Sequence, residues 1–289
     1  MKNDTIHTDF IDVGGRRIHY YHAGQSGSPL VLLHGGGVDS AWISWEELIA
    51  PLAAGHRVLV PDLPGYGQSD KPDVAYTLEF YLEFLERFLE ALGITRASLA
   101  GLSLGGGIAL GFTLQHPHRV DKLVLVDSYG LQSRLAYHKL SYLYVFTPLN
   151  ELSYWLLRRN RDLLRQSLQA SIYDPANITP QLLDAVERAI RDPFAGRAFT
   201  SFQRSELRWN GLRSDFSSRL HEVHTPTLIL HGDHDVTVPV QDAERAHQRI
   251  AGSQYVLLKN RRHWALRDHP EEIIAILLRF LGENAGDGA

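Results

Sequence analysis

Short apolar runs, separated by amphipathic stretches, give this chain an alternating pattern. The runs are rich in branched or small apolar residues, which is typical of strands buried on both faces of a parallel sheet. An earlier stretch, residues 8–22, alternates loosely around Gly14-Gly15 and predicts a hairpin. We predict the buried strands at Leu30–Leu33, Arg57–Pro61, Ala97–Ala100, Leu123–Val126, Thr227–Leu230 and Gln254–Leu258.

Helical patterns separate most of these runs. The clearest spans Thr77–Leu92, where apolar residues recur on one stripe, Thr77 can cap the first turn and Gly93 suits a left-handed C-cap. The last helix is predicted at 269–282, with a proline in its first turn and two glutamates facing its positive end. Because strands alternate with helices, we predict a three-layer α/β fold around a mostly parallel sheet.

The alternation is interrupted between residues 131 and 215. This segment has helical patterns and no convincing strand, and it holds eleven aromatic residues and eleven arginines. It is also the basic part of an otherwise acidic chain, with twelve basic and eight acidic residues. We interpret residues 131–215 as a helical cap inserted into an α/β core formed by residues 1–130 and 216–289. An ordinary run of surface helices is the alternative interpretation.

One serine lies in a glycine-rich stretch, LAGLSLGGG at residues 99–107, between a predicted strand and a predicted helix. A turn this sharp forces its central residue into strained backbone angles, and small residues on either side let the backbones pass. Ser103 would then be lifted clear of the sheet, with the N–H of Leu104 pointing where an oxyanion would form. The alternative is a packing turn in which the serine is incidental.

A nucleophilic serine needs a base, an acid that orients the base, and oxyanion donors. Candidates for each follow predicted strands, at the edge where open α/β sheets bind ligands. The sequence HGGG at residues 34–37 follows one strand, and we expect the N–H of Gly36 to be the second oxyanion donor and His34 to be structural. His263 follows the last strand and is the candidate base.

The candidate acid lies in the sequence HGDHD at residues 231–235. We expect Asp235 to be this acid, and Asp127, at the end of another strand, is the substitute candidate. Two histidines and two aspartates so close together also suggest a metal site. A turn does not converge ligands as a helix face does, and no further ligand set is apparent, so we expect no metal here.

Five motifs resemble, in order, those of the α/β-hydrolase superfamily: VLLHGGG, RVLVPDLPGYGQSDKP, LAGLSLGGGIAL, PTLILHGDHDVTVP and HWALRDHPEEI. The resemblance covers essentially the whole chain, and the order Ser103, Asp235, His263 is the order of this family. It implies that Ser103 is the nucleophile, His263 the general base and acid, and Asp235 the orienting acid. Gly36 and Leu104 would be the oxyanion donors. Two-step acyl transfer by such a site requires no cofactor.

The substrate class is narrowed by the same resemblance. A serine nucleophile disfavours the haloalkane dehalogenases and epoxide hydrolases of this fold, which use an aspartate. The wider sequence resembles carboxylesterases and the carbon–carbon bond hydrolases of aromatic ring cleavage. The latter usually have asparagine where this chain has Leu102, and Pro-Gly where it has Val38-Asp39. We therefore predict a carboxylesterase, with ring-cleavage diketones as alternative substrates and a small-molecule receptor or scaffold as an alternative of another class. Trp264 and Gly37 are expected to line the substrate pocket.

Composition restricts the partners. The 289 residues carry a net charge of −4, which lacks the basic footprint of a nucleic-acid binder. There is no cysteine, which excludes disulfides and thiolate metal sites. The first residues lack the apolar core of a secretory signal, and no apolar run reaches the roughly 20 residues of a membrane span. We therefore expect a cytoplasmic protein without a membrane span, whose partner is a small-molecule ester or ketone.

Overall fold

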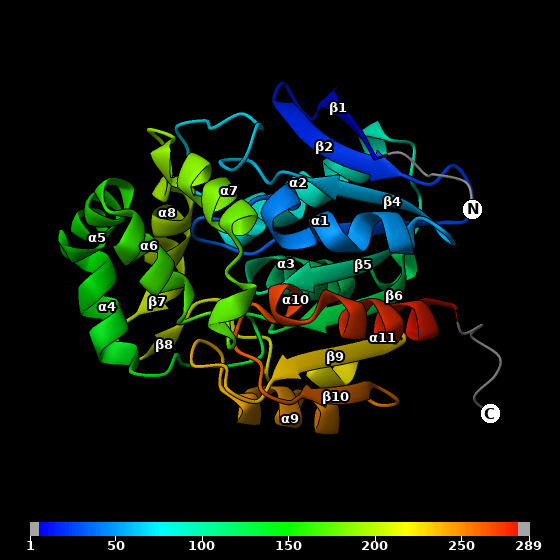
Figure 1. Cartoon of the computed structure of the whole chain (residues 1–289). Helices are drawn as coiled ribbons and strands as arrows, with labels where there is room; N and C mark the ends of the chain where they lie inside the picture. Colours follow the sequence, from blue (N-terminus) through cyan, green and yellow to red (C-terminus); the bar gives the residue numbers. More distant parts are fainter. Residues whose placement is uncertain (1–5, 283–289) are drawn as a thin grey trace.

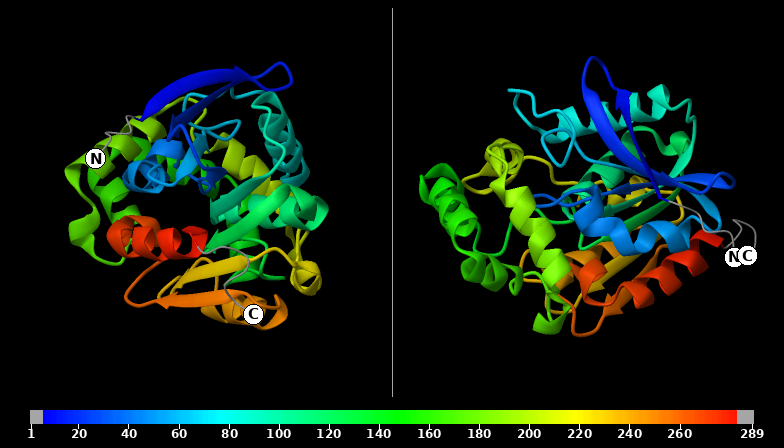
Figure 2. Two further views of the ribbon diagram at one scale, coloured as in Figure 1. Left: turned by 90° about the vertical axis from the view of Figure 1, so that its right-hand side faces the viewer. Right: turned by 45° about the horizontal axis from the view of Figure 1, so that its top comes forward.

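One eight-stranded sheet forms the centre of the computed structural model, which describes residues 6–282. The strand order is β1-β2-β4-β3-β5-β6-β9-β10, and Figure 2 shows the sheet twisting between its β1 and β10 edges. β1–β2 and β2–β4 pair antiparallel, and all the other neighbours in this sheet pair parallel. The predicted hairpin and all six predicted strands are confirmed. The strands are β1 (His7–Asp12), β2 (Arg17–Ala23), β3 (Ser28–Leu33), β4 (His56–Pro61), β5 (Ala97–Leu102), β6 (Val120–Val126), β9 (Thr227–Gly232) and β10 (Gln254–Leu258).

Helices cover both faces of the sheet and form the predicted three layers (Figure 1). Two separate clusters of buried apolar side chains fill the space between these layers, one on each face. The first face carries α1 (Ala41–Leu52), α10 (Ala265–Asp268) and α11 (Pro270–Gly282). The opposite face carries α2 (Leu78–Ala91), α3 (Leu104–Gln115) and α9 (Val240–Arg249). The short 3₁₀ turns lie at Pro117–Arg119, Pro175–Asn177 and Leu220–Glu222.

Helix α2 illustrates how directly local sequence sets an element here. Thr77 is its N-cap, and the threonine Oγ1 accepts a hydrogen bond from the N–H of Phe80 at 3.1 Å. The chain leaves the helix through Gly93, whose φ of +66° only glycine adopts without cost. The apolar stripe of α2 is buried, with the polar positions facing outward. The predicted helix is therefore confirmed within one residue at each end.

Between β6 and β9 the chain leaves the sheet to form five helices, which we call the helical segment (residues 131–215). Figure 1 shows these helices beyond the carboxyl ends of the parallel strands. The prediction that this segment contains no strand is wrong, because β7 (Leu207–Arg208) and β8 (Gly211–Leu212) form a small hairpin. Strands of two residues are too short to leave an alternating pattern. The helices are α4 (His138–Phe146), α5 (Leu149–Arg159), α6 (Arg161–Leu168), α7 (Pro180–Arg191) and α8 (Arg197–Glu206).

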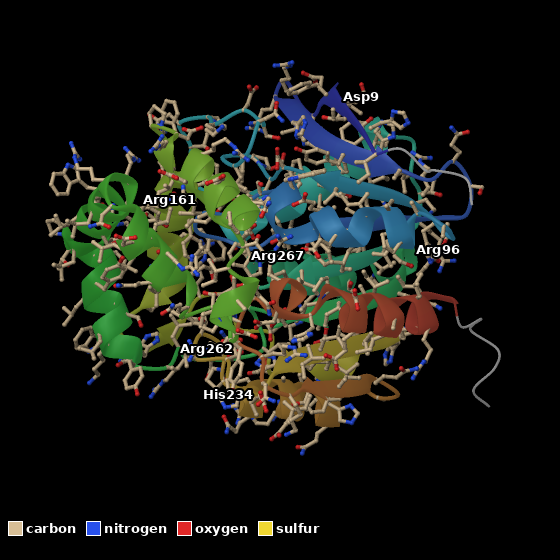
Figure 3. All side chains as sticks on the ribbon, viewed as in Figure 1. Asp9, Arg96, Arg161, His234, Arg262 and Arg267 are labelled. Carbon is tan, nitrogen blue, oxygen red and sulfur yellow. The ribbon has the colours of Figure 1, made fainter. Side chains whose placement is uncertain are left out.

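Arginines of the helical segment mostly face outward, and five of the eleven pair with acids. Arg161, labelled in Figure 3, contacts both Asp184 and Glu187 of α7. Arg204 pairs with Glu151 at 2.6 Å in the same exposed way. Such pairs contribute little stability individually. None of the helices in residues 6–282 has the length and apolar character needed to cross a membrane.

Candidate active site

Ser103 lies at the turn between β5 and α3, as predicted. Its backbone angles, φ 49° and ψ −114°, fall outside the regions that most residues adopt. A Cβ on Gly101 would lie 2.2 Å from the carbonyl oxygen of Gly105, and a Cβ on Gly105 would lie 2.3 Å from that of Leu33. Glycine is required on both sides of the serine because backbone passes where a side chain would stand.

The three residues predicted as nucleophile, acid and base lie in one hydrogen-bonded chain. The Oγ of Ser103 lies 2.9 Å from Nε2 of His263, and Nδ1 of His263 lies 2.8 Å from Oδ2 of Asp235. His263 is in the loop between β10 and α10, and Asp235 is in the turn after β9. Because Asp235 accepts the Nδ1 proton, the lone pair of Nε2 faces the serine hydroxyl. This is the tautomer that a general base needs.

Electrostatics in this chain favour an ion pair between the acid and the base. Burial disfavours the imidazolium form of His263, but the charge and hydrogen bond of Asp235 outweigh burial and raise the pKa of His263 above its usual value. Burial acts to raise the pKa of Asp235, but His263 and further hydrogen bonds outweigh it and lower that pKa. The carboxylate of Asp235 is therefore suited to stabilise a positive charge on the imidazole of His263.

The carboxylate of Asp235 is held in place by the backbone of its own turn. Its Oδ1 accepts hydrogen bonds from the N–H groups of Thr237 at 2.7 Å and Val238 at 3.1 Å. Oδ2 is left to accept from His263. One oxygen therefore anchors the side chain and the other orients the base, so the loop itself fixes the imidazole.

Asp127, the substitute candidate for the acid, does not bond to His263. Its Oδ1 accepts the N–H of Gly232 at 2.8 Å, and its Oδ2 has no hydrogen-bond partner. Burial, and then the nearby charge of Asp235, raise its pKa well above the usual value. Asp127 thus lies behind the hydrogen-bonded chain without a hydrogen bond to His263, and the geometry favours Asp235 in the orienting position.

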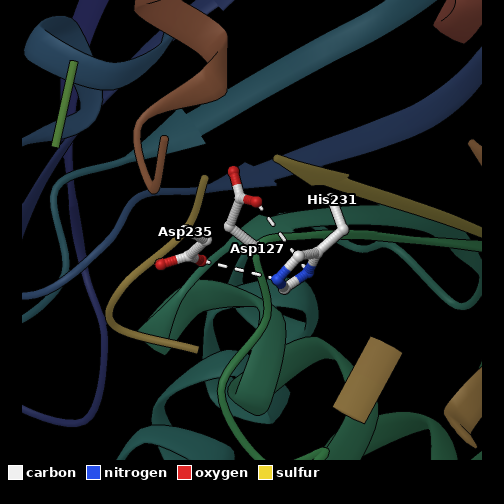
Figure 4. Close-up of side chains that lie close together, drawn as sticks. All are labelled: Asp127, His231 and Asp235. Carbon is white, nitrogen blue, oxygen red and sulfur yellow. Dashed lines mark ion pairs between the residues drawn. The ribbon is translucent and has the colours of Figure 1, made fainter. Parts of the chain in front are cut away.

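Three side chains lie close enough together to hold a metal ion, but they are not the same set that the sequence suggested. Asp127, His231 and Asp235 bring ligand atoms within 4.8 Å of one another, whereas Asp233 and His234 pair with each other nearer the surface (Figures 3 and 4). The imidazole of His231 donates its Nε2 proton to the carbonyl of Val238 at 3.0 Å. Both oxygens of Asp235 already accept hydrogen bonds. These atoms of His231 and Asp235 are thus already engaged in hydrogen bonds, so the cluster fits a hydrogen-bonded network better than a metal site.

The loop after β3 brings Gly36 to the serine. Leu63 donates its N–H to Nε2 of His34, so Nδ1 carries the proton and donates to the carbonyl of Gly35. His34 is therefore structural, as expected. On the serine side, Leu104 is the first residue of α3, where N–H groups have no partner within the helix. The geometry is compatible with Gly36 and Leu104 as the two oxyanion donors.

Asp39 is a residue of this loop that sequence reasoning missed. Its Oδ2 accepts the N–H of Gly35 at 2.8 Å and the hydroxyl of Ser44 at 2.7 Å, and its Oδ1 accepts the N–H of Ser40. It thereby ties the glycine loop to the start of α1. An aspartate four residues after the first glycine of HGGG can fold such a loop back on itself. In the sequence, Asp39 stood out only because it departs from the Pro-Gly of the carbon–carbon bond hydrolases.

Two pockets meet at Ser103. The large pocket encloses about 280 Å³, and its wall includes Gly37 and Trp264, the two residues expected to line the substrate pocket. The small pocket encloses about 90 Å³ on the other side of the serine. Trp264 is 7% exposed and donates its indole N–H to Ser44 at 3.2 Å, so it also joins the wall to α1. Apolar side chains of the helical segment complete the large pocket, among them Leu157, Leu164, Leu168, Val186 and Phe199.

Comparison with known proteins agrees with this architecture. The model of the alpha/beta hydrolase fold family matches residues 28–270. A 2-hydroxy-6-oxo-6-phenylhexa-2,4-dienoate hydrolase of Comamonas testosteroni is 32% identical over 281 residues and covers 93% of each chain. The structure of a serine hydrolase involved in carbazole degradation has a TM-score of 0.80 at 26% identity, covering 96% of this chain and 99% of that chain. A membrane phospholipase A has the same TM-score at 25% identity, covering 96% and 86%.

Proposed function

The chain is a serine hydrolase of the α/β hydrolase family, and we propose that it hydrolyses small carboxylic esters through an acyl-enzyme on Ser103. In the first step, Nε2 of His263 takes the hydroxyl proton while Oγ attacks the ester carbonyl. The N–H groups of Gly36 and Leu104 stabilise the oxyanion of the tetrahedral intermediate. His263 then gives its proton to the leaving alcohol, and water hydrolyses the acyl-enzyme by the same steps.

The observation that carries the choice of esters is that the walls of the pockets at Ser103 contain no lysine or arginine among the described residues. Lys71 and Arg188 line a different cavity, which adjoins the large pocket at residues 37–39. Lys71 pairs there with Asp192 at 3.3 Å. A substrate carboxylate would lose its hydration without gaining a cationic partner. A neutral ester avoids this cost.

The helical segment acts in this proposal as a cap that shapes the substrate pocket. Its residues supply the apolar wall of the large pocket, while the sheet loops supply the polar reacting groups. A mostly apolar cavity with a few converging polar groups is typical of small-molecule sites. The proposed boundaries are those predicted, with residues 131–215 as the cap and residues 1–130 and 216–289 as the core.

Hydrolysis of p-nitrophenyl esters from acetate to decanoate tests the proposal. We expect activity that peaks at one chain length, because side chains of the helical segment line the large pocket and limit its size. Ser103→Ala should lower kcat/KM by at least about 10⁴-fold. A Ser103→Ala variant that retains most of the activity would overturn the acyl-enzyme mechanism, whatever the substrate.

Carbon–carbon bond hydrolysis is the second candidate, and the dienoate hydrolase from Comamonas testosteroni favours it. That substrate carries a carboxylate, for which the pockets at Ser103 supply no cation among the described residues. The decay of the substrate's visible absorbance measures its cleavage directly. We expect kcat/KM for p-nitrophenyl esters to exceed that for 2-hydroxy-6-oxo-6-phenylhexa-2,4-dienoate. The opposite order would replace the esterase proposal with the second candidate.

A further inference from the structure

The small pocket at Ser103 contains buried polar atoms that the protein does not satisfy. Gln132 is 1% exposed, and neither its amide oxygen nor its amide nitrogen has a hydrogen-bond partner within the protein. Glu206, also 1% exposed, has no partner for its Oε1. Both side chains line the small pocket together with Ser103 itself. Unpaired buried polar groups are costly, so three of them at one cavity call for an explanation.

The Oε2 atom of Glu206 has two hydrogen-bond partners within the protein, so the orientation of the carboxylate is fixed and Oε1 is the unpaired oxygen. Oε2 accepts the hydroxyl of Tyr129 at 2.8 Å and the N–H of Ser214 at 2.9 Å. Burial and the neighbouring Glu206 raise the pKa of Tyr129, so the phenol stays protonated and donates. No lysine, arginine or histidine within residues 6–282 forms an ion pair with Glu206, and Oε1 remains available as an acceptor.

From this arrangement we propose that the small pocket binds a hydroxyl group of the substrate, so that the preferred esters carry a hydroxyl a few atoms from the reacting carbonyl. This inference rests on the proposed ester hydrolysis at Ser103 and deepens it. A hydroxyl donates one hydrogen bond and accepts others. It can therefore donate to Oε1 of Glu206 and accept from the amide nitrogen of Gln132 at the same time.

Other groups match the pocket less well. An ammonium group has no lone pair to accept from the amide of Gln132, and a carboxylate would face the acidic Glu206 without a cation in the pocket wall. A plain alkyl group would leave all three polar atoms unpaired. The volume of about 90 Å³ limits the occupant to a short hydroxyalkyl group of a few heavy atoms.

Two pairs of esters test the proposal from both sides of the reacting bond. Methyl 3-hydroxybutanoate is compared with methyl butanoate, and 2-hydroxyethyl butanoate with ethyl butanoate, by pH-stat measurement of kcat/KM. We expect the hydroxyl to raise kcat/KM about 10- to 100-fold in one pair, which corresponds to pairing a buried polar group that is otherwise left without a partner. Which pair responds identifies whether the pocket holds the acyl or the alcohol part.

Variants decide whether the pocket is responsible. Gln132→Leu should bring the hydroxyl-to-parent ratio close to one, and Glu206→Gln, which keeps the side-chain volume, should lower it as well. Gln166→Leu is the matched control, because Gln166 is exposed on α6 and lines neither pocket at Ser103. It should leave the ratio unchanged. A hydroxyl preference that is absent in the wild type, or that survives Gln132→Leu, would overturn the proposal while ester hydrolysis stands.

Binding to Ser103→Ala separates this inference from the proposed function. Calorimetric titration of that variant with methyl 3-hydroxybutanoate, 2-hydroxyethyl butanoate and their parents needs no turnover. If the wild type hydrolyses no ester, the proposed function fails, but the titration still tests whether the small pocket binds a hydroxyl group. Tighter binding of a hydroxy ester by about tenfold or more, lost when Gln132→Leu is added, supports the hydroxyl site. Equal binding of ester and hydroxy ester overturns it.

Discussion

The sheet loops and the helical segment contribute to the same site in different ways. Strand β5, which leads to Ser103, is buried along its whole length. Helices α4 and α5 instead leave large apolar side chains in solvent, with Leu140 66% and Trp155 49% exposed. The reacting groups stand at strand ends of the buried sheet, whereas apolar side chains of the helical segment line the large pocket beside them. The sheet loops therefore set the geometry of the reacting groups, and the helical segment sets the shape of the pocket wall.

This contrast predicts two kinds of variant. Changes at the strand ends should lower kcat for every substrate, because they disturb the transition state. Changes in the helical segment should alter the order of preference among substrates, because they reshape the wall of the pocket. Experiments that compare matched residues from the two regions can test whether the two kinds of effect are separate.

The largest effect is expected from the acid of the catalytic chain. Asp235→Asn should lower kcat by about 10⁴-fold, because an amide can donate to Nδ1 of His263 and stabilise the wrong tautomer. Asp127→Asn is the matched control on the neighbouring strand, and we expect it to lower kcat by less than about tenfold, since Asp127 bonds to Gly232 instead. Steady-state kinetics with p-nitrophenyl butyrate measure both. Equal losses in the two variants would mean that the aspartates act as one unit.

The next largest effect is the loss of activity in acid. His263 must be neutral to accept the serine proton, so kcat/KM should fall about tenfold per pH unit below its pKa. Burial alone would lower that pKa, but Asp235, with smaller contributions from Asp127 and Asp39, raises it above the usual value of about 6.5. In the pH profile of kcat/KM for the wild type, the fall in activity should therefore begin at a pH above this value.

The Asp235→Asn variant tests the cause of this shift. Removing the carboxylate leaves burial as the dominant influence, so the pKa of the imidazole should fall. NMR titration of His263 in both proteins measures this without requiring activity. An unchanged pKa in Asp235→Asn would contradict the electrostatic account, even if the kinetic loss in that variant were as large as expected.

The sheet and the meeting of Ser103, Asp235 and His263 could be predicted from sequence because their signals are local. Each buried run marks a strand, and the carboxyl ends of parallel strands share one edge, so Ser103, Asp235 and His263 meet although they are far apart in sequence. The pattern did not predict the hairpin of β7 and β8, whose strands have two residues each. The gathering of Asp127 with His231 also depends on strand neighbours, not on spacing within the turn.

Contacts between the two regions left no signal in the sequence at all. Phe199 of α8 lies over Gly36, and a Cβ on Gly36 would lie 2.3 Å from its ring. Gln132 and Glu206 face the small pocket, but in the sequence they are isolated polar residues among many. Such contacts are decided by how helices dock on the sheet, and neither periodicity nor capping encodes that docking.

The third effect probes this contact. Gly36→Ala should lower kcat/KM about 10- to 100-fold, because the added methyl displaces either the loop that carries Gly36 or the ring of Phe199. Gly55→Ala is the control, since a Cβ there meets nothing within 4 Å. Adding Phe199→Ala to Gly36→Ala should restore part of the loss if the ring is the obstacle. Additive effects in this double-mutant cycle would show that the two regions are not coupled at this point.

The smallest effect is expected from the pocket wall of the helical segment. Leu168 is buried on α6 and lines the large pocket, so Leu168→Ala should lengthen the preferred acyl chain. Each additional methylene that the pocket accommodates is worth about 0.8 kcal/mol, or about fourfold in kcat/KM. Leu152→Ala, on the exposed surface of α5, is the matched control and should leave the chain-length profile unchanged. If Leu168→Ala lowers kcat equally for all chain lengths, the segment fixes the reacting groups as well as the substrate, and the two regions cannot be separated in function.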